Sequence, residues 1–220
     1  EDMGPAGNQA VNAILASRDR GLTISRGQGK KRATLEEYVA WWLRELGLID
    51  SFRVEPIAEG GQLYRVLVRK TPKAAEVLVT DVGFGVSQIL PVLVLCFYVP
   101  EGSTVILEQP EIHLHPFVQA GLADVFIDAW KKRRVQILLE SHSEHLLRRL
   151  QRRVAEEGVT PGEVALYFCS AEEGESRLTP LAIDLFGNIE NWPKDFFGDE
   201  FGEVAAMSRA VQKRKKRAEG

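Results

Sequence analysis

The chain has 220 residues, of which 45% are hydrophobic and 27% are charged, and its formal net charge is −3. This composition is typical of a globular protein and excludes a disordered chain. The net charge excludes an overall basic field for nucleic acid, but it is compatible with local basic patches. The two cysteines, Cys96 and Cys169, are too few for a disulfide framework and favour free thiols in a reducing, cytoplasmic compartment.

The longest apolar run, Ile89–Val99, is shorter than the roughly 20 residues that span a bilayer, so no membrane partner is expected. No signal peptide is evident. The chain begins at Glu1 without a methionine, which suggests a processed chain or a fragment of a longer protein.

Residues 1–75 form the first predicted region, which is either part of the main domain or an insertion into it. Thr34 and Glu37 have the spacing of a capping box, so a helix is expected to begin there and to end at Gly47. Three strands are then predicted, at residues 52–58, 62–70 and 76–80, with the turn Glu59-Gly60-Gly61 between the first two.

Residues 76–158 form the second predicted region, in which helices and strands alternate. This order predicts an α/β fold, with a parallel sheet and helices on its faces. The predicted elements are a helix at 87–98, a strand at 104–108, a helix at 116–130, a strand at 135–140 and a helix at 144–157.

Residues 159–220 are predicted to form a small α+β appendage at the C-terminus. A hairpin is expected from strands 163–171 and 177–185, because the polar segment between them favours a turn. The aromatic segment 191–201 precedes a final helix that ends in the cationic run Lys213–Arg217.

Polar side chains follow both predicted parallel strands. Thr104–Leu107 leads into Glu108, Gln109 and Glu111, and the cluster ends at Pro116, which suits the first turn of a helix. Parallel strands bring their carboxyl ends to one edge of a sheet, and a carboxylate there is a common holder of hydrated Mg²⁺ beside a phosphate.

All four histidines lie after these two strands: His113 and His115 after the first, His142 and His145 after the second. His142 stands between two serines at a strand-to-helix junction, which favours a functional role, whereas His145 is more typical of a capping or core histidine.

The segment Gly83–Gln88 is a third candidate site. Gly83 and Gly85 allow close approach of a ligand to the backbone, and Ser87 at the start of a helix offers a hydroxyl and free amides to an anion. A plain turn followed by an N-cap explains the same residues equally well.

Taken in order, these motifs resemble the C-terminal half of an ABC-type ATPase, and most closely the SMC-like and OLD-like bacterial AAA ATPases. The family's Walker B motif typically reads apolar-Asp-Glu-Pro-Glu-x-x-Leu-His-Pro, which resembles the chain from Thr104 to Pro116. The segment Asn191–Phe197 resembles an uncharacterised C-terminal domain found on one branch of these proteins. The resemblance implies ATP and Mg²⁺ as ligands and a homodimer with nucleotide between its subunits.

By position, the resemblance places Glu108 where the Walker B aspartate holds Mg²⁺ through water. Gln109 stands where the family has the glutamate that activates the attacking water, and Glu111 is the nearest carboxylate that could replace it. His142 matches the switch histidine that contacts the γ-phosphate, and His115 lies where the dimer-crossing loop begins. Gly83, Gly85, Ser87 and Gln88 match the signature motif, which binds the ATP held by the other subunit.

One part of such an ATPase has no counterpart here, because no Gly-x-x-x-x-Gly-Lys-Ser/Thr occurs in the sequence. The segment Gly27–Lys31 lacks the required spacing and hydroxyl, and it is interpreted as a solvated basic loop. The chain is therefore expected to be the C-terminal part of a longer ATPase, inactive alone, whose N-terminal lobe is supplied elsewhere. Conformational work in DNA or RNA repair, or in phage defence, is the expected output.

Two alternatives remain open. A degenerate module that binds partners without hydrolysing ATP would suit the glutamine at position 109, and a metal-dependent hydrolase would use the histidines and glutamates. Nucleic acid is a further candidate partner, because one arc of the last predicted helix of the second region is cationic, although a solvated face explains this arc as well. The residues of that arc are Arg148, Arg149, Arg152 and Arg153.

Overall fold

The computed structural model describes residues 9–58, 64–172, 174–193, 196, 206–211 and 214. The chain divides into two compact units, residues 1–150 and 151–220, and the division falls inside a helix. The predicted N-terminal region 1–75 lies in the same unit as residues 76–150. No helix within the described ranges is long and apolar enough to cross a membrane.

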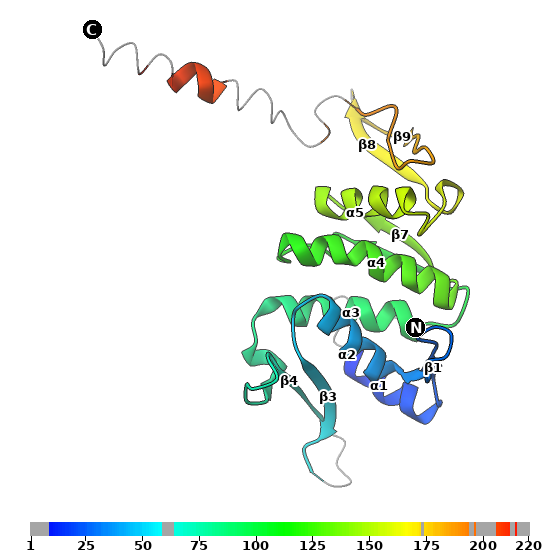
Figure 1. The fold of residues 1–220 in the computed structure, drawn as a ribbon, viewed down its shortest axis with the longest axis vertical. Coiled ribbons are helices and arrows are strands. Elements are labelled where there is room, and N and C mark those ends of the chain that lie inside the picture. The colour runs from blue at the N-terminus through cyan, green and yellow to red at the C-terminus, as the bar shows by residue number, and fades with distance from the viewer. Residues whose placement is uncertain are drawn as a thin grey trace. The chain divides into compact units, whose positions relative to one another are not determined.

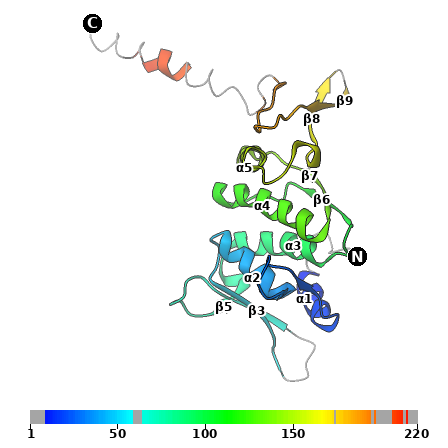
Figure 2. The ribbon, with the colours of Figure 1, turned by 45° about the vertical axis from the view of Figure 1, so that its right-hand side comes forward.

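The first unit is built around α3 (Phe84–Tyr98), which is enclosed by other helices. α1 (Ala10–Asp19) and α2 (Leu35–Glu45) pack against it, and α4 (Pro116–Arg133) lies on its other side in both ribbon views (Figures 1 and 2). The central residues Leu93 and Val94 are fully buried. A helix that neighbours cover all round is expected to be apolar all round, which explains the long apolar run in the sequence.

The start of α3 differs from the prediction. We expect Ser87 to open this helix, but it begins three residues earlier at Phe84, with Gly83 as its N-cap. Gly83 has φ +82°, a backbone conformation that glycine adopts without a steric penalty, so the chain turns directly from the preceding 3₁₀ turn into the helix. Ser87 is therefore inside the first turn and does not cap the helix.

The predicted capping box of α2 is confirmed. The Thr34 hydroxyl accepts a hydrogen bond from the Glu37 N–H, and the Glu37 carboxylate accepts one from the Thr34 N–H at 2.8 Å. Gly47 closes the helix with φ +68°, and the Leu48 N–H donates to the Leu43 carbonyl at 3.0 Å. Two-residue strands, β1 (Thr23–Ile24) and β2 (Ala33–Thr34), pair in the chain segment before α2.

A small antiparallel sheet follows α2. It consists of β3 (Ser51–Pro56), β4 (Tyr64–Arg69) and β5 (Val77–Leu78), in that order. The predicted turn at 59–61 lies outside the described residues. β5 is shorter than predicted, because Val79–Asp81 turn into a 3₁₀ helix that leads to α3.

The predicted parallel sheet is confirmed as the pair β6 (Thr104–Glu108) and β7 (Gln136–Glu140), with α4 as the crossover between them. The register is direct, so Thr104 lies beside Gln136 and Glu108 beside Glu140. Side chains alternate along each strand: Val105 and Leu107 are buried in the helical core, whereas Ile106 and Glu108 are exposed. α4 begins with Pro116 at its first position, as predicted.

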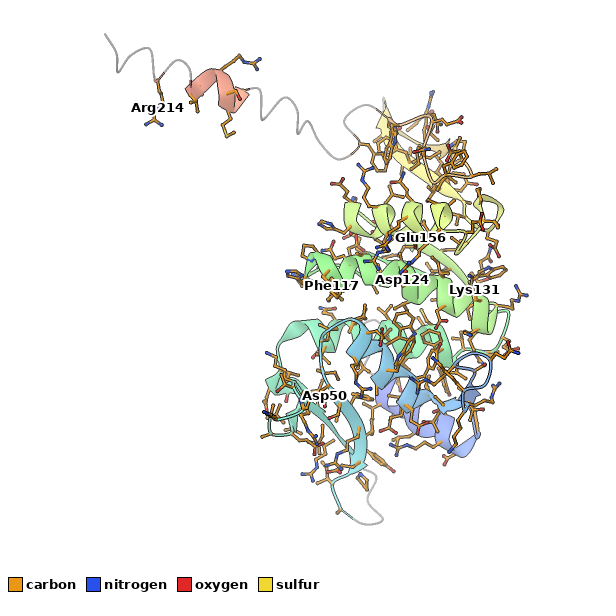
Figure 3. All side chains as sticks on the ribbon, viewed as in Figure 1. Asp50, Phe117, Asp124, Lys131, Glu156 and Arg214 are labelled. Atoms are coloured by element: carbon orange, nitrogen blue, oxygen red, sulfur yellow. The ribbon has the colours of Figure 1, made fainter. Side chains whose placement is uncertain are left out.

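The second unit contains the predicted hairpin. Its strands, β8 (Leu166–Glu172) and β9 (Glu175–Leu181), follow a short 3₁₀ turn at Pro161–Glu163. The turn between the strands is tighter than predicted, since pairing continues to Glu172 and Glu175. The final predicted helix is present at residues 206–211, and its cationic end lies outside the described residues except for Arg214 (Figure 3).

Candidate functional site

Two carboxylates stand side by side at the carboxyl ends of the parallel strands. Glu108 ends β6 and Glu140 ends β7, and the direct register makes them neighbours. Both belong to the exposed face of the sheet, where the side chain of Glu140 is 59% exposed. The alternation along β6 therefore sends the first predicted site residue, Glu108, to the open side of the sheet.

Gln109 is tied to Glu140 by its backbone and its side chain. The Gln109 N–H donates to the Glu140 carbonyl at 2.9 Å, and its side-chain amide donates to Glu140 Oε1 at 2.8 Å. Gln109 has φ +46°, which is uncommon for a residue other than glycine. These two bonds help to hold that conformation, so the chain turns sharply at the end of β6 and leaves the amide beside the Glu140 carboxylate.

Glu111 has a different environment, because it is 5% exposed. Its Oε1 accepts hydrogen bonds from the Ser141 hydroxyl at 2.8 Å and from the His142 N–H at 2.7 Å. Oε2 is buried without a hydrogen-bond partner among the residues that the structure describes. This carboxylate therefore joins the turn after β6 to the turn after β7.

A second set of hydrogen bonds continues from this joint into the helices. The Ser143 hydroxyl donates to Gln119 Oε1 at 2.7 Å and accepts from the Leu146 N–H at 3.1 Å, so it caps α5 (Glu144–Ala155). The Gln119 amide donates to the Leu114 carbonyl at 2.9 Å. The Ser143 N–H also donates to the Ser141 hydroxyl at 3.1 Å, so the two loops and the starts of α4 and α5 share one partly buried polar network.

His142 is open to solvent, and its side chain is 78% exposed. Its Nε2 lies 4.0 Å from Glu140 Oε1, so a protonated imidazole would be attracted to that carboxylate. His115 caps α4, since its Nδ1 accepts from the Phe117 N–H at 3.2 Å. His113, with φ +63°, and His145 are exposed.

The structure brings together Glu108, Gln109, Glu140 and His142, which we call the strand-end cluster. The signature-like segment Gly83–Gln88 has no hydrogen bond or ion pair with this cluster in the described part of the chain. Its residues Ser87 and Gln88 are exposed at the start of α3. Within the same described ranges, no group of three or more His, Cys, Asp or Glu residues has the geometry of a metal site.

Glu140 is the member of the cluster that was not predicted from the sequence. In the sequence it is simply the last residue of a mostly apolar strand, after Leu139, and it belongs to no recognised motif. The signal that could have found it is that both strand patterns end in Leu-Glu, because aligning these ends places Glu140 beside Glu108.

Comparison with known families and structures agrees with these features. Residues 61–148 match the family described as "AAA domain, putative AbiEii toxin, Type IV TA system". Residues 159–207 match the family described as "Protein of unknown function (DUF3696)", as the resemblance of the aromatic segment predicted. No curated protein matches the chain.

Among solved structures, one similar chain comes from work on "ATP-driven dimerization and DNA stimulated activation of SMC ATPases". It has 12% sequence identity and a TM-score of 0.53, and the match covers 67% of this chain and 83% of that chain. Another is the "SmcHead bound to the C-winged helix domain of ScpA", with 10% identity and a TM-score of 0.52, covering 68% of this chain and 43% of that one. The predicted α/β fold with a parallel sheet is therefore that of an SMC head. Residues 61–148 match an AAA domain family, and the chain shares the fold of SMC ATPase heads, which together support a place among the ABC/SMC-like AAA ATPases.

Proposed function

We propose that this chain supplies one part of an ATP-hydrolysing site, in a protein that closes as a dimer around ATP and opens after hydrolysis. The observation that carries the proposal is the strand-end cluster, in which Glu108 and Glu140 lie in register at the open edge of a parallel sheet. Ligands of α/β proteins bind at this edge, outside the carboxyl ends of the strands.

The side chains of the cluster fit a magnesium ion chemically. Exposed carboxylate oxygens are hard ligands, and Mg²⁺ usually takes only one or two of them and completes its shell with water and phosphate oxygens. Glu108 is the proposed holder of this ion, as expected from its place in the sequence, and Glu140 lies beside it. The ion would neutralise charge that develops on the phosphates during transfer.

Water activation is the step in which Gln109 and Glu140 act together in our proposal. A glutamine orients water but cannot take its proton. The Gln109 amide is hydrogen-bonded to Glu140 Oε1, and Glu140 is an exposed carboxylate that can accept the proton.

Glu111 was the expected replacement for the base. Its burial and its bonds to Ser141 and His142 support a positioning role, in which it holds the switch loop against the turn after β6. In this role Glu111 sets the place of His142, the proposed contact to the γ-phosphate.

The exposed apolar side chains on the open face of the β6–β7 pair are a reason to propose that a further lobe completes the site. Ile106 is 68% exposed and Leu138 is 50% exposed, and they are neighbours on the same face as Glu108 and Glu140. Apolar residues at such positions are typical of a face that another element covers. We propose that a lobe with the Walker A loop covers it, either from residues outside this sequence or from another chain.

The signature-like segment would act across the dimer. Gly83, Gly85, Ser87 and Gln88 lie at an exposed helix start, apart from the strand-end cluster, which suits a contact to the ATP held by the partner subunit. His115 at the start of α4 is the proposed beginning of the dimer-crossing segment. Work on DNA or RNA in repair or phage defence remains the proposed output, in the cytoplasm, where the free cysteines Cys96 and Cys169 would stay reduced.

The test is ATP turnover by the protein assembled with its Walker A lobe, before and after Glu108→Gln. We expect turnover to fall by roughly two to three orders of magnitude, because a neutral amide holds Mg²⁺ poorly. Nucleotide-dependent dimerisation, measured by light scattering, serves as the control for binding. An assembled protein that neither hydrolyses ATP nor dimerises with it contradicts the proposal.

The identity of the base is tested by ranking three substitutions. We expect Glu140→Gln to slow turnover most in a single-turnover assay and Gln109→Ala to follow, whereas Glu111→Gln should act through the position of the switch loop. If Glu111→Gln has the largest effect and leaves the stability of the chain unchanged, Glu111 is the base.

A second candidate is an ATPase-like module that binds ATP without hydrolysing it, and the glutamine at position 109 favours it. The same single-turnover assay separates the two, since a binding module consumes no ATP on any timescale. The metal-hydrolase alternative has no support in the geometry, because the described residues do not form a transition-metal site.

A further inference from the structure

A concave site separate from the strand-end cluster lies between α2 and the loop that joins β1 to β2. It has a volume of about 290 Å³, and neither family match includes its residues. The residues that give it its chemical character are Arg26, Lys31, Arg32, Glu37, Trp41 and Arg44. We call this site the basic pocket.

The sequence builds the basic pocket from two segments. Glu37, Trp41 and Arg44 are spaced by four and three residues, so they lie on one face of α2, opposite the face buried in the core. The other wall is the loop that sequence analysis interprets as solvated, which Gly27 (φ +111°) and Gly29 (φ +74°) allow to turn. The loop thereby brings Lys31 and its neighbours toward the helix.

The positive charge of the basic pocket is only partly compensated. Four cations face one carboxylate, so the lining has a formal charge of +3. The carboxylate of Glu37 already accepts the Thr34 N–H in the capping box. In the described part of the chain, none of the four cations forms an ion pair.

The cationic arc of α5 differs from the basic pocket in its ion pairs. Its four arginines are all ion-paired, with Glu144, Asp124 and Glu156 as partners. The charge of this arc is therefore largely offset by neighbouring carboxylates, because four arginines share three acidic partners. The four cations of the basic pocket have no such acidic partners among the described residues.

The guanidinium groups of the pocket are held in place by neutral partners, which leave their charge intact. Arg32 Nε donates to the Thr23 hydroxyl at 2.8 Å, and Arg44 donates to the Asp50 carbonyl from Nε at 2.9 Å and from Nη2 at 2.7 Å. The Arg26 guanidinium lies over the Trp41 ring, 5.7 Å from its centroid. Side chains that are already ordered lose little entropy when they bind a ligand.

We propose that the basic pocket binds the phosphate group of a phosphorylated ligand. A phosphate carries up to two negative charges, which the charge of +3 can neutralise, and the fork of an arginine matches its oxygens in a bidentate way. The phosphate can belong to a free phosphorylated compound or to the backbone of a nucleic acid. This site is independent of the proposed ATP site.

The test is calorimetric titration of the 220-residue chain with pyrophosphate and, separately, with a short oligothymidylate, at low and at physiological salt. Binding of either probe is expected to weaken by roughly tenfold or more in the double variant Arg26→Ala/Lys31→Ala, since each loses a charge-assisted contact. The matched control is Arg148→Ala/Arg152→Ala, which also removes two arginine or lysine charges and should leave the affinity within about twofold.

The two probes distinguish the source of the phosphate. Binding of pyrophosphate that the pocket variant weakens supports a free phosphorylated ligand, and binding of the oligonucleotide alone supports a nucleic-acid backbone, with a steep salt dependence. The proposal is overturned if neither probe binds, if the pocket variant binds as tightly as the unmodified chain, or if the control weakens equally. Should the double variant fail to fold by circular dichroism, Lys31→Glu alone takes its place, because Lys31 is exposed.

Discussion

The two faces of the β6–β7 pair have different roles: one packs into the core and stabilises the fold, and the other carries the proposed site. On the covered face, Val105 and Leu107 pack into the core of helices. On the open face, Glu108 and Glu140 stand beside Ile106 and Leu138, all exposed. Because side chains alternate along a strand, the five residues of each strand contribute to both faces. The core face and the open face can therefore be altered by separate substitutions.

The difference between the faces is sharpest for Leu107 and Ile106, which are neighbours in the sequence. Leu107→Ala should lower the free energy of unfolding by about 3 kcal/mol, because it leaves a cavity in the core. Ile106→Ala should change it by less than about 0.5 kcal/mol, since Ile106 is 68% exposed. Urea unfolding measures both; equal losses would mean that the open face is also part of the core.

The two glutamates that flank the turn after β6 provide a second pair. Glu111→Ala should cost about 2 kcal/mol of stability, because the Ser141 hydroxyl and the His142 N–H both lose their acceptor. The control is Glu108→Ala, which removes the same side chain from the open face and should be nearly neutral. Thermal unfolding of the two variants compares their stabilities directly. If Glu111→Ala leaves the stability unchanged, the positioning role of Glu111 is contradicted.

A smaller effect is expected from Asp128, a partly buried acid of α4 that is hydrogen-bonded to α2. Burial raises the pKa of Asp128, although it accepts hydrogen bonds from the Tyr38 hydroxyl and from Trp42 Nε1 at 3.2 Å. Since the folded state favours the protonated acid, its stability contribution is present below the unfolded pKa and is lost as pH rises through the folded pKa.

Asp128→Asn removes this titration and keeps an acceptor for Tyr38. The stability of the variant relative to the unmodified chain should therefore increase as pH rises from the unfolded pKa of an aspartate toward neutrality, by less than the two effects above. Unfolding measured across this pH window checks the sign. A difference that is constant with pH would show that burial does not penalise the charged form.

Patterns within short stretches of the sequence predicted most helix starts and the order of the strands correctly. The capping box of Thr34 and Glu37, the proline that starts α4 and the parallel pairing of β6 and β7 are confirmed. The start of α3 was wrong, because the preference of serine for an N-cap was weighed above the freedom of Gly83 to turn the chain.

The site was less predictable, because its contacts join residues far apart in the chain. Glu108 and His142 were singled out from their place at strand ends, and the structure puts them in one cluster. The burial of Glu111 depends on a serine 30 residues away, and the pairing of Gln109 with Glu140 depends on the strand register. Neither follows from local pattern, so these remain features that only the folded chain reveals.

The direct register of β6 and β7 also limits how this region can vary. An added or lost residue in the middle of either strand would shift every side chain beyond it to the opposite face. Glu108 or Glu140 would then enter the core, and Leu107 or Leu139 would enter the solvent. Insertions should therefore accumulate in the turn Pro100–Ser103 or near Arg134, which precede the strands, while the length of each strand stays fixed among relatives that keep the site.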